Sequence, residues 1–215
     1  MEMLELINVR PPNPLTGPGI EGIRAMLRAR QTLLVHFNTP MTNHATGYPH
    51  DLRDAIANPQ WDMGYSTITA ASQGPSQIPM EQASACGSVG IIVDLNPAST
   101  LIRICGMDGG SNSRIGSPGD GEDPSVSVAE QSLTPAGGYN EWVLNGAVVL
   151  GIFSFKDPRV FRTGVGELPA TMQEVRNDFP GRRLISVYQG AFQAWTPTSK
   201  AWDPVTYDNI LGYPT

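Results

Sequence analysis

Three polar residues lie within short apolar, strand-forming runs of the sequence and are the best candidates for chemistry: His36, Ser66 and Glu141. The case for Glu141 is the strongest. It lies between Tyr139 and Trp142, and an acidic side chain among aromatic residues needs a partner if it is buried. The sequence therefore predicts a functional carboxylate at the beginning of a late strand.

Other catalytic patterns are absent from the sequence. It contains no Gly-Lys-Ser/Thr phosphate loop, no Gly-x-Ser-x-Gly motif and no His-Glu-x-x-His motif. A hydrolase with metal ligands from His44 or His50 and from an Asp-rich loop remains a further alternative. That loop holds Asp108, Asp120, Glu122 and Asp123 without the regular order of a calcium loop, so we predict a solvated loop and no metal site.

Composition limits the class of protein. The chain has 215 residues, of which 40% are hydrophobic, 16% charged, 23 Gly and 19 Pro. This mixture excludes a coiled coil, a helical bundle and a charged disordered chain, and it favours short strands with many turns. The net charge of −6 argues against a nucleic-acid partner, because phosphate binding needs clustered positive charge.

Targeting signals and cysteine patterns are also missing. The beginning of the chain, Met1 to Glu5, lacks the basic and apolar regions of a signal peptide, and no apolar run reaches membrane-spanning length. Cys86 and Cys105 lack metal-ligand spacing. We therefore expect a soluble protein, either cytoplasmic or exported by a leaderless secretion system.

The pattern of apolar residues predicts one α+β domain over residues 19–215, after an extended Pro-rich segment 1–18. The expected core covers 30–155, and 156–215 adds a helix, a strand and an aromatic tail that packs on the body. Helices are expected at three places: 19–30, a short segment from Pro49, and 169–177. Strands are expected at 32–37, 64–70, 87–94, 100–105, 142–144, 147–155 and 184–188.

Turn residues predict which strands are neighbours. Asn145-Gly146 is a strong two-residue hairpin signal and predicts that 142–144 pairs with 147–155. The turn at Asn96-Pro97 predicts that 100–105 pairs with the strand before it. Residues 64–70 are expected at a strand edge, and 107–124 are expected to form a long exposed loop.

The order of the polar residues resembles the plan of the ADP-ribosyltransferase toxin superfamily. The resemblance covers roughly residues 30–155 and rests on three segments: Val35-His36-Phe37-Asn38-Thr39, Tyr65-Ser66-Thr67-Ile68 and Tyr139-Asn140-Glu141-Trp142-Val143-Leu144. The stretch from Gly47 to Ile56 is also similar to the short helix before the Ser-Thr motif in pierisin-like members. Ile68 stands where that motif usually has Ser, and Tyr139 stands where family members carry Glu or Gln, which puts the target class in doubt.

The resemblance implies a fold with a mixed or antiparallel β-sandwich core, and it implies that NAD is the substrate. In that family a carboxylate stabilises the cationic ribose that forms when nicotinamide leaves, a role that falls to Glu141, oriented by Ser66. His36, Asn38, Thr67 and Tyr65 would contact NAD. The acceptor of ADP-ribose would be an unidentified protein, a small molecule or water, and a cognate inhibitor protein could accompany a toxin.

Each candidate also has a purely structural interpretation. Tyr65 suits ordinary strand packing, Ser66 and Thr67 suit hydrogen bonding at a strand edge, and His36 suits a satisfied core position. The alternative function is a non-catalytic, β-rich binding module with Trp142, Trp195 and Trp202 as contact residues. The two functions differ in whether Ser66 and Glu141 converge in one cleft, and positions on different faces would exclude the enzyme.

Overall fold

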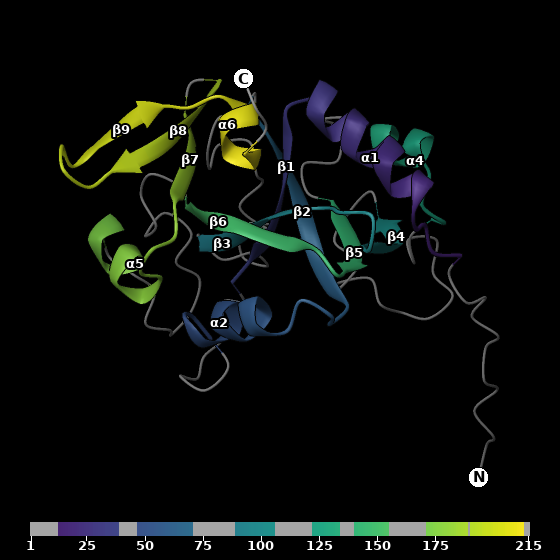
Figure 1. Ribbon diagram of the computed structural model, residues 1–215, viewed down its shortest axis with the longest axis horizontal. Coiled ribbons are helices and arrows are strands. Elements are labelled where there is room, and N and C mark those ends of the chain that lie inside the picture. Colours follow the sequence, from purple (N-terminus) through teal and green to yellow (C-terminus); the bar gives the residue numbers. More distant parts are fainter. Residues whose placement is uncertain are drawn as a thin grey trace, which may run out of the picture.

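The structure, a computed structural model, describes residues 13–38, 47–70, 89–105, 122–133, 140–154, 171–188 and 190–212. Its helices surround a central sheet (Figure 1). The described helices are α1 (Pro18–Ala29), α2 (His50–Ala57), α4 (Val126–Ser132), α5 (Met172–Asp178) and α6 (Tyr207–Leu211). The described strands are β1 (Thr32–Phe37), β2 (Met63–Thr69), β3 (Val89–Asp94), β4 (Thr100–Cys105), β5 (Glu141–Asn145), β6 (Val148–Ser154), β7 (Leu184–Tyr188), β8 (Ala191–Thr196) and β9 (Ala201–Pro204).

These described strands form one sheet in the order β4-β5-β2-β1-β3-β6-β7-β8-β9. Neighbouring strands are antiparallel except β6 and β7, which are parallel. The α+β class predicted from the sequence is confirmed. Hydrogen bonding joins the described strands into a single continuous sheet, so the expected two-sheet sandwich is not what they form.

The two N-terminal helices follow the predicted periodicity. α1 buries Ile20, Ile23, Met26 and Leu27, which recur at helical spacing, and it begins at Pro18, a residue favoured in the first helical turn. α2 begins just after Pro49 and buries Leu52 and Ala55. None of the described helices is long and apolar enough to cross a membrane.

Three helices differ from the sequence prediction, including α6, which was not predicted. α4 was not predicted, although Ser125 caps it by accepting a hydrogen bond from the N–H of Val128 at 3.2 Å. α5 begins at Met172, later than predicted, because Thr171 and Glu174 form a capping box.

The predicted strand pairings were wrong in two places. β5 lies between β4 and β2, and β6 lies between β3 and β7, so Asn145-Gly146 does not form a hairpin. Gly146 has the expected positive φ of 71°, but its N–H donates to the carbonyl of Pro59 at 2.7 Å instead of closing a two-strand ladder. β4 likewise pairs with β5 and not with the preceding strand β3.

The position of β2 also differs from the prediction. It is not an edge strand, because it lies between β1 and β5. The chain instead protects one edge of β4 with the extended N-terminal segment: the N–H of Leu15 donates to the carbonyl of Leu101 at 2.8 Å, and that of Leu101 returns the bond at 3.0 Å.

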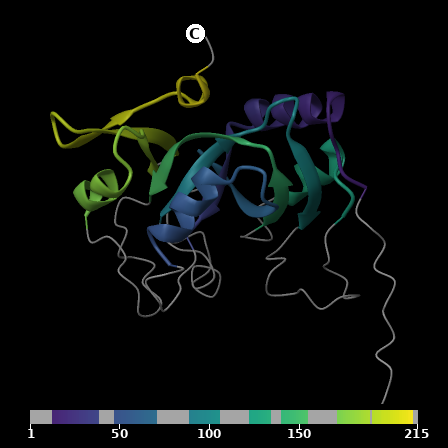
Figure 2. The same ribbon diagram turned by 60° about the horizontal axis from the view of Figure 1, so that its bottom comes forward.

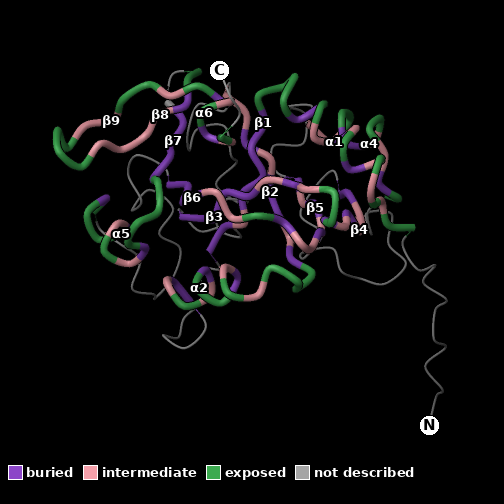
Figure 3. The backbone as a smooth tube through the Cα atoms, viewed as in Figure 1, coloured by how far each residue is buried: buried purple, intermediate pink, exposed green. Residues whose placement is uncertain are grey.

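The two faces of the sheet carry separate hydrophobic clusters, with the most buried backbone in the central strands (Figure 3). Alternate residues of β1 belong to different clusters: Leu34 to the first, and Leu33 and Val35 to the second. The first cluster contains buried residues of α1, α2, α4 and α5, and we call its side of the sheet the helical face. The second contains residues of α6, and we call its side the opposite face.

The aromatic C-terminal region packs on the body, as predicted, over its described residues. The rings of Trp195 and Trp202 meet at 5.5 Å between centroids across β8 and β9. Tyr207 is buried, and its hydroxyl donates to the carbonyl of Thr32 at 3.0 Å. This bond holds α6 near the beginning of β1, while β8 and β9 extend to the side (Figure 2).

Candidate functional site

Glu141 and Ser66 lie on neighbouring strands and on the same face of the sheet. The printed register pairs Tyr65 of β2 with Trp142 of β5, so the next position along places Ser66 opposite Glu141. Ser66 shares its face with Ile68, a member of the second cluster. Both candidate residues therefore point to the opposite face, where Ser66 is buried and Glu141 is half-buried.

Gly64 provides the space that the Glu141 carboxylate occupies. A Cβ atom on Gly64 would lie 2.9 Å from Cδ of Glu141 and 3.0 Å from its Cγ, and even closer to Oε1. The side chain of Glu141 therefore lies directly over Gly64 of the neighbouring strand. Sequence reasoning missed this residue, although a glycine inside a strand often marks the close approach of another group.

Asn140 fixes the backbone immediately before Glu141. Its Oδ1 accepts from the backbone N–H of Thr67 at 2.9 Å and lies 3.0 Å from the Thr67 hydroxyl. Its Nδ2 donates to the carbonyl of Ser132, at the end of α4, at 2.9 Å. Because Asn140 is only 6% exposed, these bonds are shielded from water.

Trp142 fixes the backbone immediately after Glu141. It is fully buried, and its Nε1 donates to the hydroxyl of Ser132 at 3.0 Å. That hydroxyl in turn donates to the carbonyl of Ala129 at 2.8 Å. Since α4 anchors the residues on both sides of Glu141, the carboxylate projects from a rigid strand entrance.

His36 lies on the helical face, away from Glu141. Its Nδ1 is 2.8 Å from the carbonyl oxygen of Gly64, so Nδ1 carries the proton and the imidazole donates. Its ring lies 5.6 Å from that of Tyr65 at an interplanar angle of 56°. Burial lowers the pKa of His36, because the charged imidazolium loses its hydration there.

The other predicted NAD contacts also lie on the helical face. Tyr65 is 2% exposed within the first cluster, and burial raises its pKa. Thr67 bonds to Asn140, as described above. Asn38 is fully buried at the end of β1, where its backbone N–H donates to the carbonyl of Val89 at 2.7 Å and its Oδ1 accepts from the N–H of Val89 at 3.0 Å.

The structure thus brings together Glu141 and Ser66 and separates them from His36, Asn38, Tyr65 and Thr67. The contacts of His36, Tyr65 and Thr67 agree with their structural interpretations, and Asn38 joins the end of β1 to β3. Trp142 is a core residue, and so it offers no exposed surface to a partner.

The metal alternative receives no support from the described part of the chain, where no three His, Cys, Asp or Glu residues gather to hold an ion. His50 is exposed at the beginning of α2. His44, Asp108, Asp120, Cys86 and Tyr139 lie outside the described residues.

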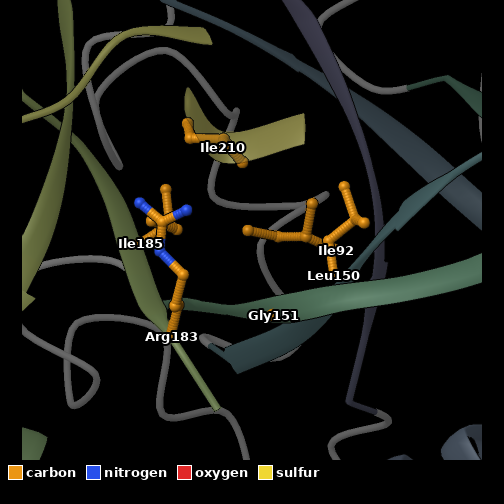
Figure 4. A pocket seen from close by; sticks show the side chains of 6 residues that line it. All are labelled: Ile92, Leu150, Gly151, Arg183, Ile185 and Ile210. Carbon is orange, nitrogen blue, oxygen red and sulfur yellow. The ribbon is translucent and has the colours of Figure 1, made fainter. Parts of the chain in front are cut away.

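A small hollow of about 150 Å³ lies on the opposite face under α6 (Figure 4). It is lined by Ile92, Leu150, Gly151, Arg183, Ile185 and Ile210. Nη1 of Arg183 donates to the carbonyl of Asn209 at 2.7 Å. The hollow contains no candidate residue and has no room for even a water molecule.

Comparisons of the chain with protein-family models, with curated proteins and with solved structures found no match.

Proposed function

We propose that this protein is an NAD-dependent mono-ADP-ribosyltransferase with an ADP-ribosyltransferase-like fold. It would cleave the nicotinamide–ribose bond of NAD and transfer ADP-ribose to an acceptor or to water. One observation carries the proposal: Glu141 and the hydroxyl-bearing Ser66 occupy facing positions of neighbouring strands on one face of the sheet, where the Glu141 carboxylate lies over Gly64.

The arrangement of the strands supports the proposal. The segments that carry the resemblance are far apart in the sequence, yet β1, β2 and β5 are consecutive in the sheet. β2 lies in the middle and contacts both others through hydrogen-bonded registers. Ser66 and Glu141 are 75 positions apart in the sequence, yet they lie on neighbouring strands whose backbones are about 4.8 Å apart.

Glu141 supplies the electrostatic stabilisation. As the bond between nicotinamide and C1′ of the ribose breaks, its electron pair leaves with nicotinamide, and the ribose becomes cationic. A fixed carboxylate stabilises this cation more than the ground state and so accelerates the step. The acceptor then bonds to C1′ and releases its proton to solvent.

Ser66 and the residues flanking Glu141 supply orientation. In this proposal the Ser66 hydroxyl holds the carboxylate by a hydrogen bond, while Asn140 and Trp142 hold the backbone of β5 through α4. His36 donates to the carbonyl of Gly64, so it steadies the strand segment beneath the carboxylate instead of contacting NAD on that face. Preorganisation of this kind avoids rearrangement during the reaction.

The test is nicotinamide release from NAD by the purified full chain. Glu141→Gln keeps the size of the side chain and removes its charge, and we expect the rate to fall about 10²- to 10³-fold. Glu130→Gln is the matched control, because Glu130 is an exposed residue of α4 whose ion pair with Arg30 lies away from the sheet. Equal rates for wild type and Glu141→Gln, or no release by wild type with any acceptor, would refute the proposal.

A further inference from the structure

A positively charged residue lies on the same face of the sheet as Glu141. The register pairs Arg103 of β4 with Val143 of β5. It also pairs Cys105, two positions later, with Glu141. Successive residues of a strand point to opposite faces, and Ile104 belongs to the first cluster on the helical face. Arg103 and Cys105 therefore share the opposite face with Glu141.

The carboxylate of Glu141 leans toward the row of residues that contains Arg103. A Cβ atom on Gly64 would lie 2.9 Å from Cδ of Glu141, so the carboxylate lies over Gly64. Gly64 pairs with Val143, and Val143 pairs with Arg103, so these three residues form one row across β2, β5 and β4. The backbones of Gly64 and Arg103 are thus two strand spacings apart, roughly 10 Å.

Solvent reaches this part of the opposite face. The residues around the carboxylate are all half-buried, namely Arg103, Val143, Glu141 and Gly64. The second cluster packs the opposite face from β2 to β8, but none of its members among the described residues lies on β4 or β5. The end of the sheet that carries Arg103 and Glu141 is therefore partly open to solvent, unlike the packed centre of the sheet.

An arginine at this position suits a phosphate group. Its guanidinium binds phosphate through two parallel N–H···O bonds and stays charged at any pH at which the protein is folded. The chain has a net charge of −6, so an anionic ligand needs a local positive charge to bind beside a carboxylate. A ligand that lies between Glu141 and Arg103 is favoured if its cationic part faces the carboxylate and its anionic part faces the guanidinium. A ribose 5′-phosphate acquires this polarity when its C1′ becomes cationic.

We propose that Arg103 binds the 5′-phosphate of the ribose whose C1′ faces Glu141. The inference rests on the proposed function for the identity of that ribose, and it adds a selection among substrates. NAD and nicotinamide mononucleotide carry the 5′-phosphate and are good substrates, whereas nicotinamide riboside lacks it and is a poor one.

The first measurement is steady-state nicotinamide release by the full chain from nicotinamide mononucleotide and from nicotinamide riboside. Arg103→Gln should lower kcat/KM for the mononucleotide about 10- to 100-fold, mainly through KM, because it removes hydrogen bonds to a charged group. With the riboside, Arg103→Gln should equal wild type. Arg103→Lys keeps the charge and loses the planar fork, so its KM for the mononucleotide should lie between the two.

Arg182→Gln is the matched control, because it also removes one arginine charge. Arg182 is exposed just before β7, and four strands separate β7 from β5 in the sheet. Both substrates should therefore be cleaved by Arg182→Gln as by wild type.

The second measurement needs no catalysis and uses isothermal titration with ADP-ribose, which carries the same ribose 5′-phosphate and no nicotinamide. We expect binding to wild type and to Glu141→Gln, and at least tenfold weaker binding to Arg103→Gln. If wild type releases no nicotinamide but ADP-ribose binding depends on Arg103, the proposed function fails and the phosphate site stands. If wild type cleaves the mononucleotide and Arg103→Gln matches it with both substrates, the phosphate site is overturned and the proposed function stands. Absence of ADP-ribose binding to wild type, or equal binding to Arg103→Gln, also overturns the phosphate site. If Arg103→Gln does not fold, Arg103→Lys carries both tests.

Discussion

Asn140 is expected to control the rate through the position of Glu141, without touching the substrate. Asn140→Ala removes the acceptor for the Thr67 N–H, the contact with the Thr67 hydroxyl and the donor to the Ser132 carbonyl. At about 1 kcal/mol for each bond, the free energy of unfolding should fall by about 3 kcal/mol. For a chain of this length the midpoint of thermal unfolding should then fall by about 6–12 °C.

The assay is steady-state nicotinamide release, well below the unfolding temperature of the variant. A displacement of about 1 Å at a catalytic group can cost roughly a hundredfold in rate, so kcat should fall about 10- to 100-fold while KM for NAD changes little. Asn140→Asp retains the acceptor for Thr67 and loses the donor to Ser132, and its kcat should lie between those of wild type and Asn140→Ala.

The control for this prediction is Met172→Ala in α5. Met172 is buried in the first cluster, so its truncation should cost about 2–5 kcal/mol, but it has no bond to β5. We expect a similar loss of stability with an unchanged kcat. If Asn140→Ala lowers stability and leaves kcat at the level of Met172→Ala, the positioning argument is refuted.

Two further predictions concern the strands around the site. Gly64→Ala should displace the Glu141 carboxylate and reduce nicotinamide release at least tenfold with little loss of stability, because the added methyl group meets the end of a side chain. Gly90→Ala is the contrasting control, since its methyl group would lie 2.5 Å from the backbone carbonyl of His36, and it should mainly lower the unfolding temperature. Burial lowers the pKa of His36 in the folded state. As the pH drops below about 6.5, the imidazole of His36 therefore becomes protonated more readily in the unfolded chain than in the folded one, and the free energy of unfolding should fall. In denaturant titrations at pH 8 and pH 5, His36→Gln should show a smaller loss between the two pH values than wild type; an equal loss would contradict the assigned burial effect.

Local sequence signals predicted most of the described elements, but not α4, α6, β8 or β9. The spacing of Ile20, Ile23 and Leu27 was sufficient for α1, because a helix that covers a sheet must repeat its apolar residues at that period. The wrong pairings were non-local. The positive φ of Gly146 was foreseeable from Asn145-Gly146, but the partners of β5 and β6 lie up to 81 positions away, as for Met63 and Leu144.

The candidate site was predictable in part. Glu141 and Ser66 were identified from residue type and order, and their common face required the register of β2 and β5. The period of two along a strand already implies that Tyr65 and Ser66 point to opposite faces, so a single site containing both conflicted with the sequence itself. Asn140 could not be found without α4, whose Ser132 accepts its second hydrogen bond.

The most direct test of the account is a double-mutant cycle on Glu141 and Ser66, measured as single-turnover cleavage of NAD. If Ser66 acts by orienting Glu141, Ser66→Ala should slow cleavage in the wild-type background and have little further effect once Glu141 is Gln. Losses that multiply independently in the double variant would contradict the claim that the two side chains act together on one face of the sheet.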